Sequence, residues 1–197
     1  MLYTAIDVGY KNLGLIQVEL NPTATSVVSP LFMKKIDISR IPHKNVSFCK
    51  CGIPHTNEVA DHVAHFIQEY QDILHSADVI LMERQPPGGL TNIEALLFFV
   101  FRDKIKLISP NSVHCHFGFG HLDYEQRKER VVYIASKYIT LPDIERKHDI
   151  ADAFCMILYE VQQNQLKFKR TEEIKRLPFD NYRFNAEGVV REASRSI

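Results

Sequence analysis

The sequence has no tryptophan, only eight glycines and four cysteines among its 197 residues, and no excess of charge of either sign. Its longest purely apolar run, Ala95–Phe101, is much shorter than a membrane span. The first residues lack the pattern of a signal peptide, so the cysteines are expected to be reduced thiols rather than disulfides. We therefore expect a soluble, intracellular protein with no membrane anchor.

The composition that remains is typical of an ordinary folded domain, with 45% hydrophobic and 24% charged residues. Such a chain is long enough for one well-buried domain and too short for two large ones. We expect one domain over residues 1–184 and a disordered tail over residues 185–197, which carries no apolar period. The stretch 163–183 is rich in lysine and arginine, and is either a phosphate-binding surface or a solvated polar helix.

Two acidic residues end short apolar segments that are typical of buried strands. Asp7 follows the first such segment, and Glu83 follows Val79–Met82 and precedes a Pro-Pro-Gly-Gly sequence that stops the strand. A carboxylate in such a place is costly unless it is paired or binds a metal ion. If the two strands are parallel neighbours, their carboxyl ends bring both acids to one edge of a sheet. Gly9 allows backbone or a ligand to approach Asp7 closely, and Gly14 indicates either a bulge or a close contact in the second strand.

Asp149 and Asp152 are three residues apart near the start of a predicted helix, so they share one of its faces. Alone, this pair is more simply explained by helix capping and by the helix dipole. With Asp7 and Glu83 it completes a set of four carboxylates. Mg²⁺ prefers hard oxygen ligands and usually takes one or two carboxylates together with water and substrate phosphate. The four acids therefore predict a nuclease site with two Mg²⁺ ions, with Mn²⁺ as an alternative.

The order of elements predicts an α/β fold. Three strands near residues 2–8, 12–20 and 25–37 form a meander, with Pro30 placing the third at an edge or a bulge. After them we expect, in order, a helix over 57–74, a strand over 79–82, a helix from 91, a strand over 104–109, a helix after 123 and a helix near 149. This order makes a mixed five-stranded sheet, antiparallel in its first three strands and then parallel, flanked by helices.

Several helix starts carry capping signals. Thr56 or Asn57 is expected to cap the first helix. The segment Thr91–Glu94 has the pattern of a capping box, and so does Asp123 with Gln126 three residues later.

Two other segments admit more than one interpretation. The sequence ALLFFVF after Glu94 is apolar all round, which indicates either deep burial or a subunit interface. Zinc could be suggested by a cluster of His43, Cys49, Cys51 and His55. One residue between the cysteines is a tighter spacing than structural zinc sites use, so a hairpin or loop is preferred there.

The segments IDVGYKNLGL, the strand that ends at Glu83, ISPNSVHCHFGFG, Lys128 and HDIADAF together resemble the RuvC-like Holliday junction resolvases of the RNase H superfamily, and the poxvirus branch most closely. The resemblance covers residues 2–162, and the combination in this order makes it specific, because each motif alone is weak. It implies a homodimer that cuts four-way DNA junctions by paired symmetric nicks. The processes implied are DNA recombination, repair and replication, and viral genome concatemer processing. A poxvirus member would act at replication sites in the host cytoplasm.

The resemblance also implies roles for single residues. The four acidic positions of the family, which are catalytic and bind metal, fall on Asp7, Glu83, Asp149 and Asp152. Lys128 falls on a basic position near the scissile phosphate. In the implied two-metal hydrolysis, one ion activates a water and the other stabilises the leaving 3′ oxygen. Bacterial members carry a further lysine soon after the fifth strand, where this chain offers His114 or His116.

Contacts with DNA and with a second subunit are predicted on weaker grounds. The candidates for DNA binding are Lys11, Asn12, His114, His116, Phe117, Phe119, Arg127, Arg130 and Lys147. Phe117 and Phe119 are either part of a mobile loop that stacks at the crossover or plugs of the core. The candidates for the dimer contact are Leu96, Leu97, Phe98, Phe99 and Phe101, and we expect Phe98→Asp to give a weakly cutting monomer.

Other functions fit parts of the pattern. The chain could act on RNA–DNA hybrids or other branched nucleic acids, or it could bind nucleic acid without catalysis. The last is less favoured, because a pure binder gains nothing from carboxylates aimed at phosphates. ATP-binding proteins of the actin and sugar-kinase fold also open with Asp-x-Gly, but that fold needs two such domains. We therefore expect no nucleotide cofactor.

Overall fold

The computed structural model describes residues 1–20, 30–40, 56, 58–176, 182–184 and 190–192, and it describes side chains up to residue 165. The segment considered for zinc, the first part of the third expected strand, and most side chains of the basic stretch 163–183 lie outside the described residues. By its internal contacts the chain divides into two compact units, residues 1–159 and 160–197. The boundary expected at residue 184 stays a prediction.

The first unit is built on five strands. They are β1 (Leu2–Asp7), β2 (Leu13–Glu19), β3 (Pro30–Ile36), β4 (Val79–Glu83) and β5 (Ile105–Ile108), and they lie in the order β3-β2-β1-β4-β5. The first three pair antiparallel, and β1–β4 and β4–β5 pair parallel, which confirms the predicted mixed sheet. Pro30 starts the edge strand β3, where the pairing with β2 shifts register, as expected for a residue without an amide hydrogen.

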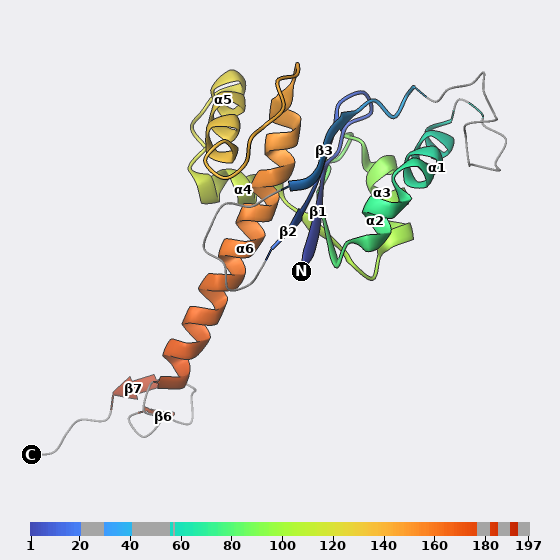
Figure 1. Cartoon of the computed structure of the whole chain (residues 1–197). Helices are drawn as coiled ribbons and strands as arrows, with labels where there is room; N and C mark the ends of the chain where they lie inside the picture. The colour runs from blue at the N-terminus through green and yellow to red at the C-terminus, as the bar shows by residue number, and fades with distance from the viewer. Residues whose placement is uncertain (21–29, 41–55, 57, 177–181, 185–189, 193–197) are drawn as a thin grey trace, which may run out of the picture. The chain divides into compact units, whose positions relative to one another are not determined.

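Helices cover both faces of this sheet (Figure 1). The helices α1 (Val59–Glu69), α2 (Gln71–Ser76) and α3 (Thr91–Phe101) lie on one side, and α4 (Pro110–Phe117), α5 (Tyr124–Ala135) and the first part of α6 (Lys147–Arg176) lie on the other. None of the described helices is both long and apolar enough to cross a membrane.

The alternation of side chains along the strands fills two cores. Ile6, Leu15 and Met82 face α1–α3 and join a core that includes Phe66 and Leu97. The intervening strand residues point to the other face, where α6 contributes buried side chains of its own, among them Ile150, Phe154 and Ile157. Side chains alternate between the two faces along a strand, so Asp7, next to Ile6, and Glu83, next to Met82, point to this second face and toward α6.

The first predicted helix is divided in two. Residues 57–74 were expected to form one helix. Instead α1 ends at Glu69 and α2 begins at Gln71, and the backbone angles of Tyr70 between them (φ −105°, ψ 22°) interrupt the helix. Tyr70 instead packs against the ring of Phe66 and accepts a hydrogen bond from Lys34 on β3. The N-cap is Glu58, so neither expected cap residue occupies it, although Thr56 Oγ1 accepts a hydrogen bond from the Glu58 amide.

One expected capping box forms and one does not. The Asp123 side chain accepts from the Gln126 amide, and Gln126 reaches back to the Asp123 amide, as predicted. In α3, however, Leu90 is the N-cap and no side chain caps it. Glu94 is engaged elsewhere, because its carboxylate accepts a hydrogen bond from the backbone amide of Gln85.

The segment after β5 is more helical than expected. Pro110 occupies the first turn of α4, a position that needs no amide donor. The helix ends at Gly118, whose left-handed conformation (φ +74°) is the usual use of glycine at a helix C-terminus. In the second unit, β6 (Tyr182–Phe184) and β7 (Val190–Glu192) pair antiparallel, so part of the expected tail is a short strand.

Candidate active site

Asp7 and Glu83 lie side by side at the carboxyl end of the sheet. Ile6 pairs with Met82 in the parallel β1–β4 ladder, so the residues that follow occupy neighbouring positions. Their side chains are close enough to influence each other's pKa. Gln85 also donates a hydrogen bond from Nε2 to Glu83 Oε2 at 2.9 Å.

A glycine allows α6 to approach this edge. Asp7 pairs with Gly14 in the β1–β2 ladder. A Cβ atom on Gly14 would lie only 2.1 Å from the carbonyl oxygen of Asp149, so the missing side chain is what leaves room for the first turn of α6. Of the two interpretations of Gly14, a bulge or a close contact, the structure shows the close contact.

The carboxylates of this site raise one another's pKa. The pKa of Asp7 is well above its usual value, first because of burial and then because Asp152, Glu83 and Asp149 repel its negative form. Burial likewise raises the pKa of Glu83. For Asp152, burial followed by repulsion from Glu83 and Asp149 raises the pKa to about 7. Without a cation, the cluster therefore retains protons near neutral pH.

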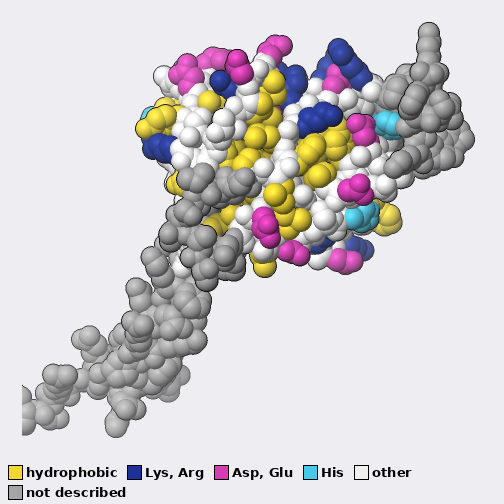
Figure 2. Space-filling model, in the orientation of Figure 1, with side chains coloured by type: hydrophobic (Ala, Val, Ile, Leu, Met, Phe, Trp, Pro, Cys, Tyr) yellow, Lys and Arg dark blue, Asp and Glu magenta, His cyan; other side chains and the backbone are white. Residues whose placement is uncertain are grey.

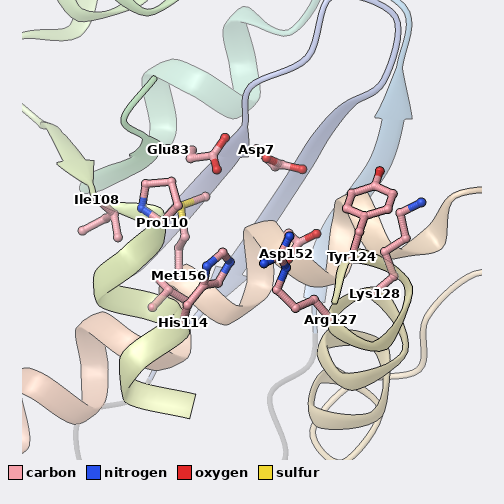
Figure 3. Close-up of a pocket in the computed structure, with 11 residues that line it drawn as sticks. Asp7, Glu83, Ile108, Pro110, His114, Tyr124, Arg127, Lys128, Asp152 and Met156 are labelled. Atoms are coloured by element: carbon pink, nitrogen blue, oxygen red, sulfur yellow. The ribbon is translucent and has the colours of Figure 1, made fainter. Parts of the chain in front are cut away.

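Asp7, Glu83 and Asp152 line one hollow of about 160 Å³, which we call the acidic pocket. Figure 3 shows Asp7 and Glu83 together at the strand ends and Asp152 across from them, between His114 of α4 and Arg127 of α5. The remaining lining residues are Ile108, Pro110, Val113, His114, Tyr124, Arg127, Lys128 and Met156. The pocket thus combines acidic groups, basic groups and an apolar wall, which accounts for the strong effect of burial on its carboxylates.

Lys128 and Arg127 bring positive charge to the acidic pocket from α5. The Nζ atom of Lys128 lies 3.7 Å from the ring centre of Tyr124 and 3.3 Å from a carboxylate oxygen of Glu125. The hydrogen bonds with Tyr124 and Glu125 raise the pKa of Lys128, so it stays charged. Lys128 lines the acidic pocket, and its predicted role there stays a prediction. Tyr124, which contacts it, was missed by the sequence reasoning. A cation placed four residues after an aromatic residue on a helix is the signal that was available.

His114 and His116 separate in the structure. His114 lines the acidic pocket, and burial followed by the charge of Arg127 lowers the pKa of its imidazole. His116 packs edge-on against the rings of Phe117 and Tyr159 instead.

The two phenylalanines of the glycine-rich segment are not an exposed wedge. Phe119 is fully buried, so it belongs to the core, and its selection as a DNA contact was wrong. Phe117 is partly buried and stacks on Phe119 with ring centres 5.8 Å apart.

Asp149 is held in an ion pair that the sequence reasoning did not anticipate. Both of its oxygens accept hydrogen bonds from Arg146, at 3.0 Å each from Nε and Nη2, and its exposed fraction is only 4%. A basic residue three positions before an acid is a detectable signal at a helix start, but the unusual backbone that aims Arg146 is not. The two acids that were expected to face outward together therefore differ: Asp152 lines the acidic pocket, and Asp149 is paired with Arg146.

A second hollow adjoins the first, and we call it the rim pocket. It has a volume of about 290 Å³ and is lined by Asp7, Val8, Gly9, Tyr10, Lys11, Asn12, Tyr124, Lys128, Arg146, His148, Asp149 and Asp152. Lys11 and Asn12 were expected near the DNA, and the structure places them here. Arg130 stacks over Tyr133 instead and borders a different hollow, and Lys147 lines neither the acidic pocket nor the rim pocket.

The apolar residues of α3 divide between core and surface. Leu97 and Phe101 are buried in the core, so they offer no surface to a second subunit and their selection was wrong. Leu96 and Phe98 are partly buried against the same core, and Phe99 is 74% exposed. The predicted contact is thereby narrowed to the part of α3 around Phe99.

The donor chemistry of the acidic pocket suits a hard divalent cation, because three partly buried carboxylates repel one another there. Across the described ranges, however, no group of three His, Cys, Asp or Glu side chains is arranged to hold a metal ion as it stands. The fourth carboxylate, Asp149, has both oxygens hydrogen-bonded to Arg146. Asp7, Glu83 and Asp152 are therefore ligands of the right chemical type for such an ion, in positions that do not yet form a complete site.

The sequence of residues 1–164 matches the family described as poxvirus A22 protein. The chain belongs to the poxvirus A22 protein family. Comparison with curated proteins gives no match.

Solved structures of Holliday junction resolvases share the fold of this A22 family member. The fowlpox virus resolvase in complex with its substrate Holliday junction DNA is 17% identical, with a TM-score of 0.57 over 83% of this chain and 98% of that chain. Thermus thermophilus RuvC in complex with a Holliday junction is 16% identical, with a TM-score of 0.54 over 84% and 96%. The yeast mitochondrial Holliday junction resolvase Ydc2 is 18% identical, with a TM-score of 0.60 over 86% and 83%. The RuvC-like, RNase H-like fold is thus shown.

Proposed function

We propose that this A22 family protein is a Mg²⁺-dependent endonuclease that resolves four-way DNA junctions by paired nicks. The observation that carries the proposal is the convergence of Asp7, Glu83 and Asp152, from three separate elements, on one hollow that also receives Arg127 and Lys128. The named relatives in complex with Holliday junction DNA support the choice of substrate.

The acidic pocket would hold the metal ions through Asp7, Glu83 and Asp152, with Asp149 completing the set. When bound, Mg²⁺ supplies Lewis-acid activation of water and of the phosphoryl oxygens. A divalent charge would also remove the mutual repulsion that raises the pKa values of these carboxylates.

The protein's own cations would receive the phosphate. Lys128 is held in place by Tyr124 and Glu125 and stays charged, so it can neutralise charge that develops on the phosphoryl oxygens. His114, with its lowered pKa, is a neutral imidazole at neutral pH and can accept a proton beside Arg127. We assign the second basic position of the family to His114 rather than to His116, which packs away from the acidic pocket.

DNA binding would depend on these local groups more than on overall charge. On the face shown in Figure 2, acidic and basic side chains are interspersed, and the chain as a whole carries no net charge. A homodimer with one active site per subunit would make the two nicks. As a member of a poxvirus family, the protein would process recombination and replication junctions and genome concatemers in the host cytoplasm.

The test is cleavage of an end-labelled synthetic four-way junction with Mg²⁺, beside linear duplex and an RNA–DNA hybrid of the same sequence. We expect symmetric, ligatable nicks on the junction, and a rate at least about a hundredfold lower for Asp7→Asn. Asp103→Asn, an exposed aspartate away from both pockets, is the matched control and should cut normally. Faster cleavage of the hybrid would overturn the substrate assignment, and tight junction binding without cleavage would favour a binding module.

A further inference from the structure

Arg146 binds Asp149, one of the four carboxylates that the sequence predicted as metal ligands. It donates to both oxygens of Asp149 at 3.0 Å, the bidentate geometry in which guanidinium and carboxylate groups bind most strongly. His148 Nε2 lies 3.2 Å from Asp149 Oδ1, yet it is buried and forms no hydrogen bond. Arg146, which directly precedes α6, is therefore the side chain that holds Asp149 by hydrogen bonds in the first turn of that helix.

The backbone of Arg146 is unusual. Its φ of +59° lies in the left-handed region, and among the described residues it is the one non-glycine residue with a positive φ. A side chain makes this conformation costly, so it persists only where surrounding contacts stabilise it. The ion pair with Asp149 is such a contact, and loss of the pair would allow this backbone to relax.

Arg146 also has another anion within its range. Its side chain is about one-third exposed and borders the rim pocket together with Lys11, Asn12 and Lys128, the groups expected to meet a DNA backbone. A phosphate offers the guanidinium the same bidentate hydrogen bonding as a carboxylate. Exchange of Asp149 for a phosphate would therefore keep the charge of Arg146 paired.

We propose that Arg146 pairs with Asp149 in the DNA-free protein and transfers to a DNA phosphate when DNA binds, so that Asp149 joins the metal site on the substrate. This rests on the proposed function for the metal site. Arg146 is a positioning residue in this scheme, because it acts through Asp149. Since linkage is reciprocal, metal and DNA should each increase the affinity for the other by the same factor.

The first measurement is Mg²⁺ binding by calorimetry in the absence of DNA. Arg146→Gln should bind Mg²⁺ at least about tenfold more tightly than wild type, because Asp149 is released. Arg146→Lys keeps the positive charge but loses the bidentate hydrogen bonding, so its Mg²⁺ affinity should lie between those of wild type and Arg146→Gln. The matched control is Arg40→Gln, which breaks another Arg–Asp pair of the same spacing, Arg40–Asp37 at 3.1 Å. It should bind Mg²⁺ as wild type does.

The second measurement does not use Arg146→Gln, so it holds even if that variant fails to fold. Ca²⁺, which takes the same oxygen ligands, is titrated into the protein alone and into its complex with linear duplex DNA. We expect binding to be at least about fivefold tighter with DNA in wild type, and the effect of DNA to be clearly smaller in the double variant Arg146→Lys, Asp149→Asn, in which phosphate ligands alone remain.

Two results would overturn the proposal: a folded Arg146→Gln variant with unchanged or weaker Mg²⁺ binding, or a wild-type metal affinity that DNA does not alter. Linear duplex offers phosphates without a junction, and neither titration depends on cleavage. A protein that passes both tests but cuts no junction would therefore contradict the proposed function alone.

Discussion

Asp152 has an unusual affinity for protons. Burial, followed by repulsion from Glu83 and Asp149, raises its pKa to about 7, while Arg127 and Lys128 act in the opposite direction. In the unfolded chain its pKa is about 3.9. The folded protein therefore binds this proton more tightly than the unfolded chain does. The stability that results is complete below about pH 4 and is lost as the pH rises through about 7.

We predict that the metal-free protein becomes less stable between pH 5 and pH 8, and that Asp152→Asn removes much of this loss. The variant should be more stable than wild type at pH 8 by about 1–3 kcal/mol, because a neutral amide is not repelled by its neighbours. Urea unfolding in EDTA at several pH values measures the effect. Asp143→Asn, at an exposed position, serves as the control and should leave the profile unchanged. Equal pH profiles for Asp152→Asn and wild type would contradict the prediction.

The acids of the site were predictable from the sequence, and the partner of one of them was not. Asp7 and Glu83 stood out because each ends an apolar strand, where a carboxylate is costly unless it is paired or binds a metal ion. Arg146 stood out in no such way, because its role depends on a left-handed backbone that no local pattern indicates. Phe119 shows the opposite error, since a glycine-flanked aromatic residue in a loop can equally be a core residue, and here it is.

At the scale of elements, the site depends on how closely α6 approaches β2. A Cβ atom on Gly14 would lie 2.1 Å from the carbonyl oxygen of Asp149, a contact with backbone that cannot move aside alone. We predict that Gly14→Ala destabilises the fold by about 1–3 kcal/mol and lowers cleavage further than its loss of stability explains, because Asp149 and Asp152 move with the helix. Thermal unfolding and cleavage rates below the melting range measure the two effects.

Gly120→Ala provides a matched control for that substitution. A Cβ atom there has no neighbour within 4 Å, so stability and cleavage should stay near wild type. Wild-type cleavage by a folded Gly14→Ala protein would show that the position of α6 is not limiting.

The elements themselves were predictable where local signals have no competitor. The Asp123 and Gln126 capping box formed as the local pattern predicts, with both reciprocal hydrogen bonds present. The expected Thr91–Glu94 capping box did not form, because the Glu94 carboxylate accepts a hydrogen bond from the backbone amide of Gln85 instead. The long first helix broke at Tyr70 because its ring and hydroxyl group make tertiary contacts with Phe66 and Lys34, which periodicity cannot reveal.

At the scale of the whole molecule, paired nicking requires two active sites on one junction, and α3 offers a surface on which two chains could associate. Phe99 is 74% exposed and Val100 next to it is 47% exposed, although both side chains are apolar. Burial of one such side chain contributes about 1.5–3 kcal/mol. Phe98 is a poorer probe than the sequence suggested, because it also packs on the core and its loss would disturb the fold.

We therefore predict that Phe99→Asp is folded but monomeric at concentrations where wild type is a dimer, with a dimer dissociation constant at least about a hundredfold higher. The reason is that a carboxylate would lose its water in the interface without gaining a partner. Sedimentation velocity gives the mass, and junction products give the outcome, with single nicks replacing ligatable paired nicks. Leu31→Asp, at a 58% exposed position on β3, is the control and should stay dimeric. A dimeric Phe99→Asp protein that still makes paired nicks would exclude α3 as the contact.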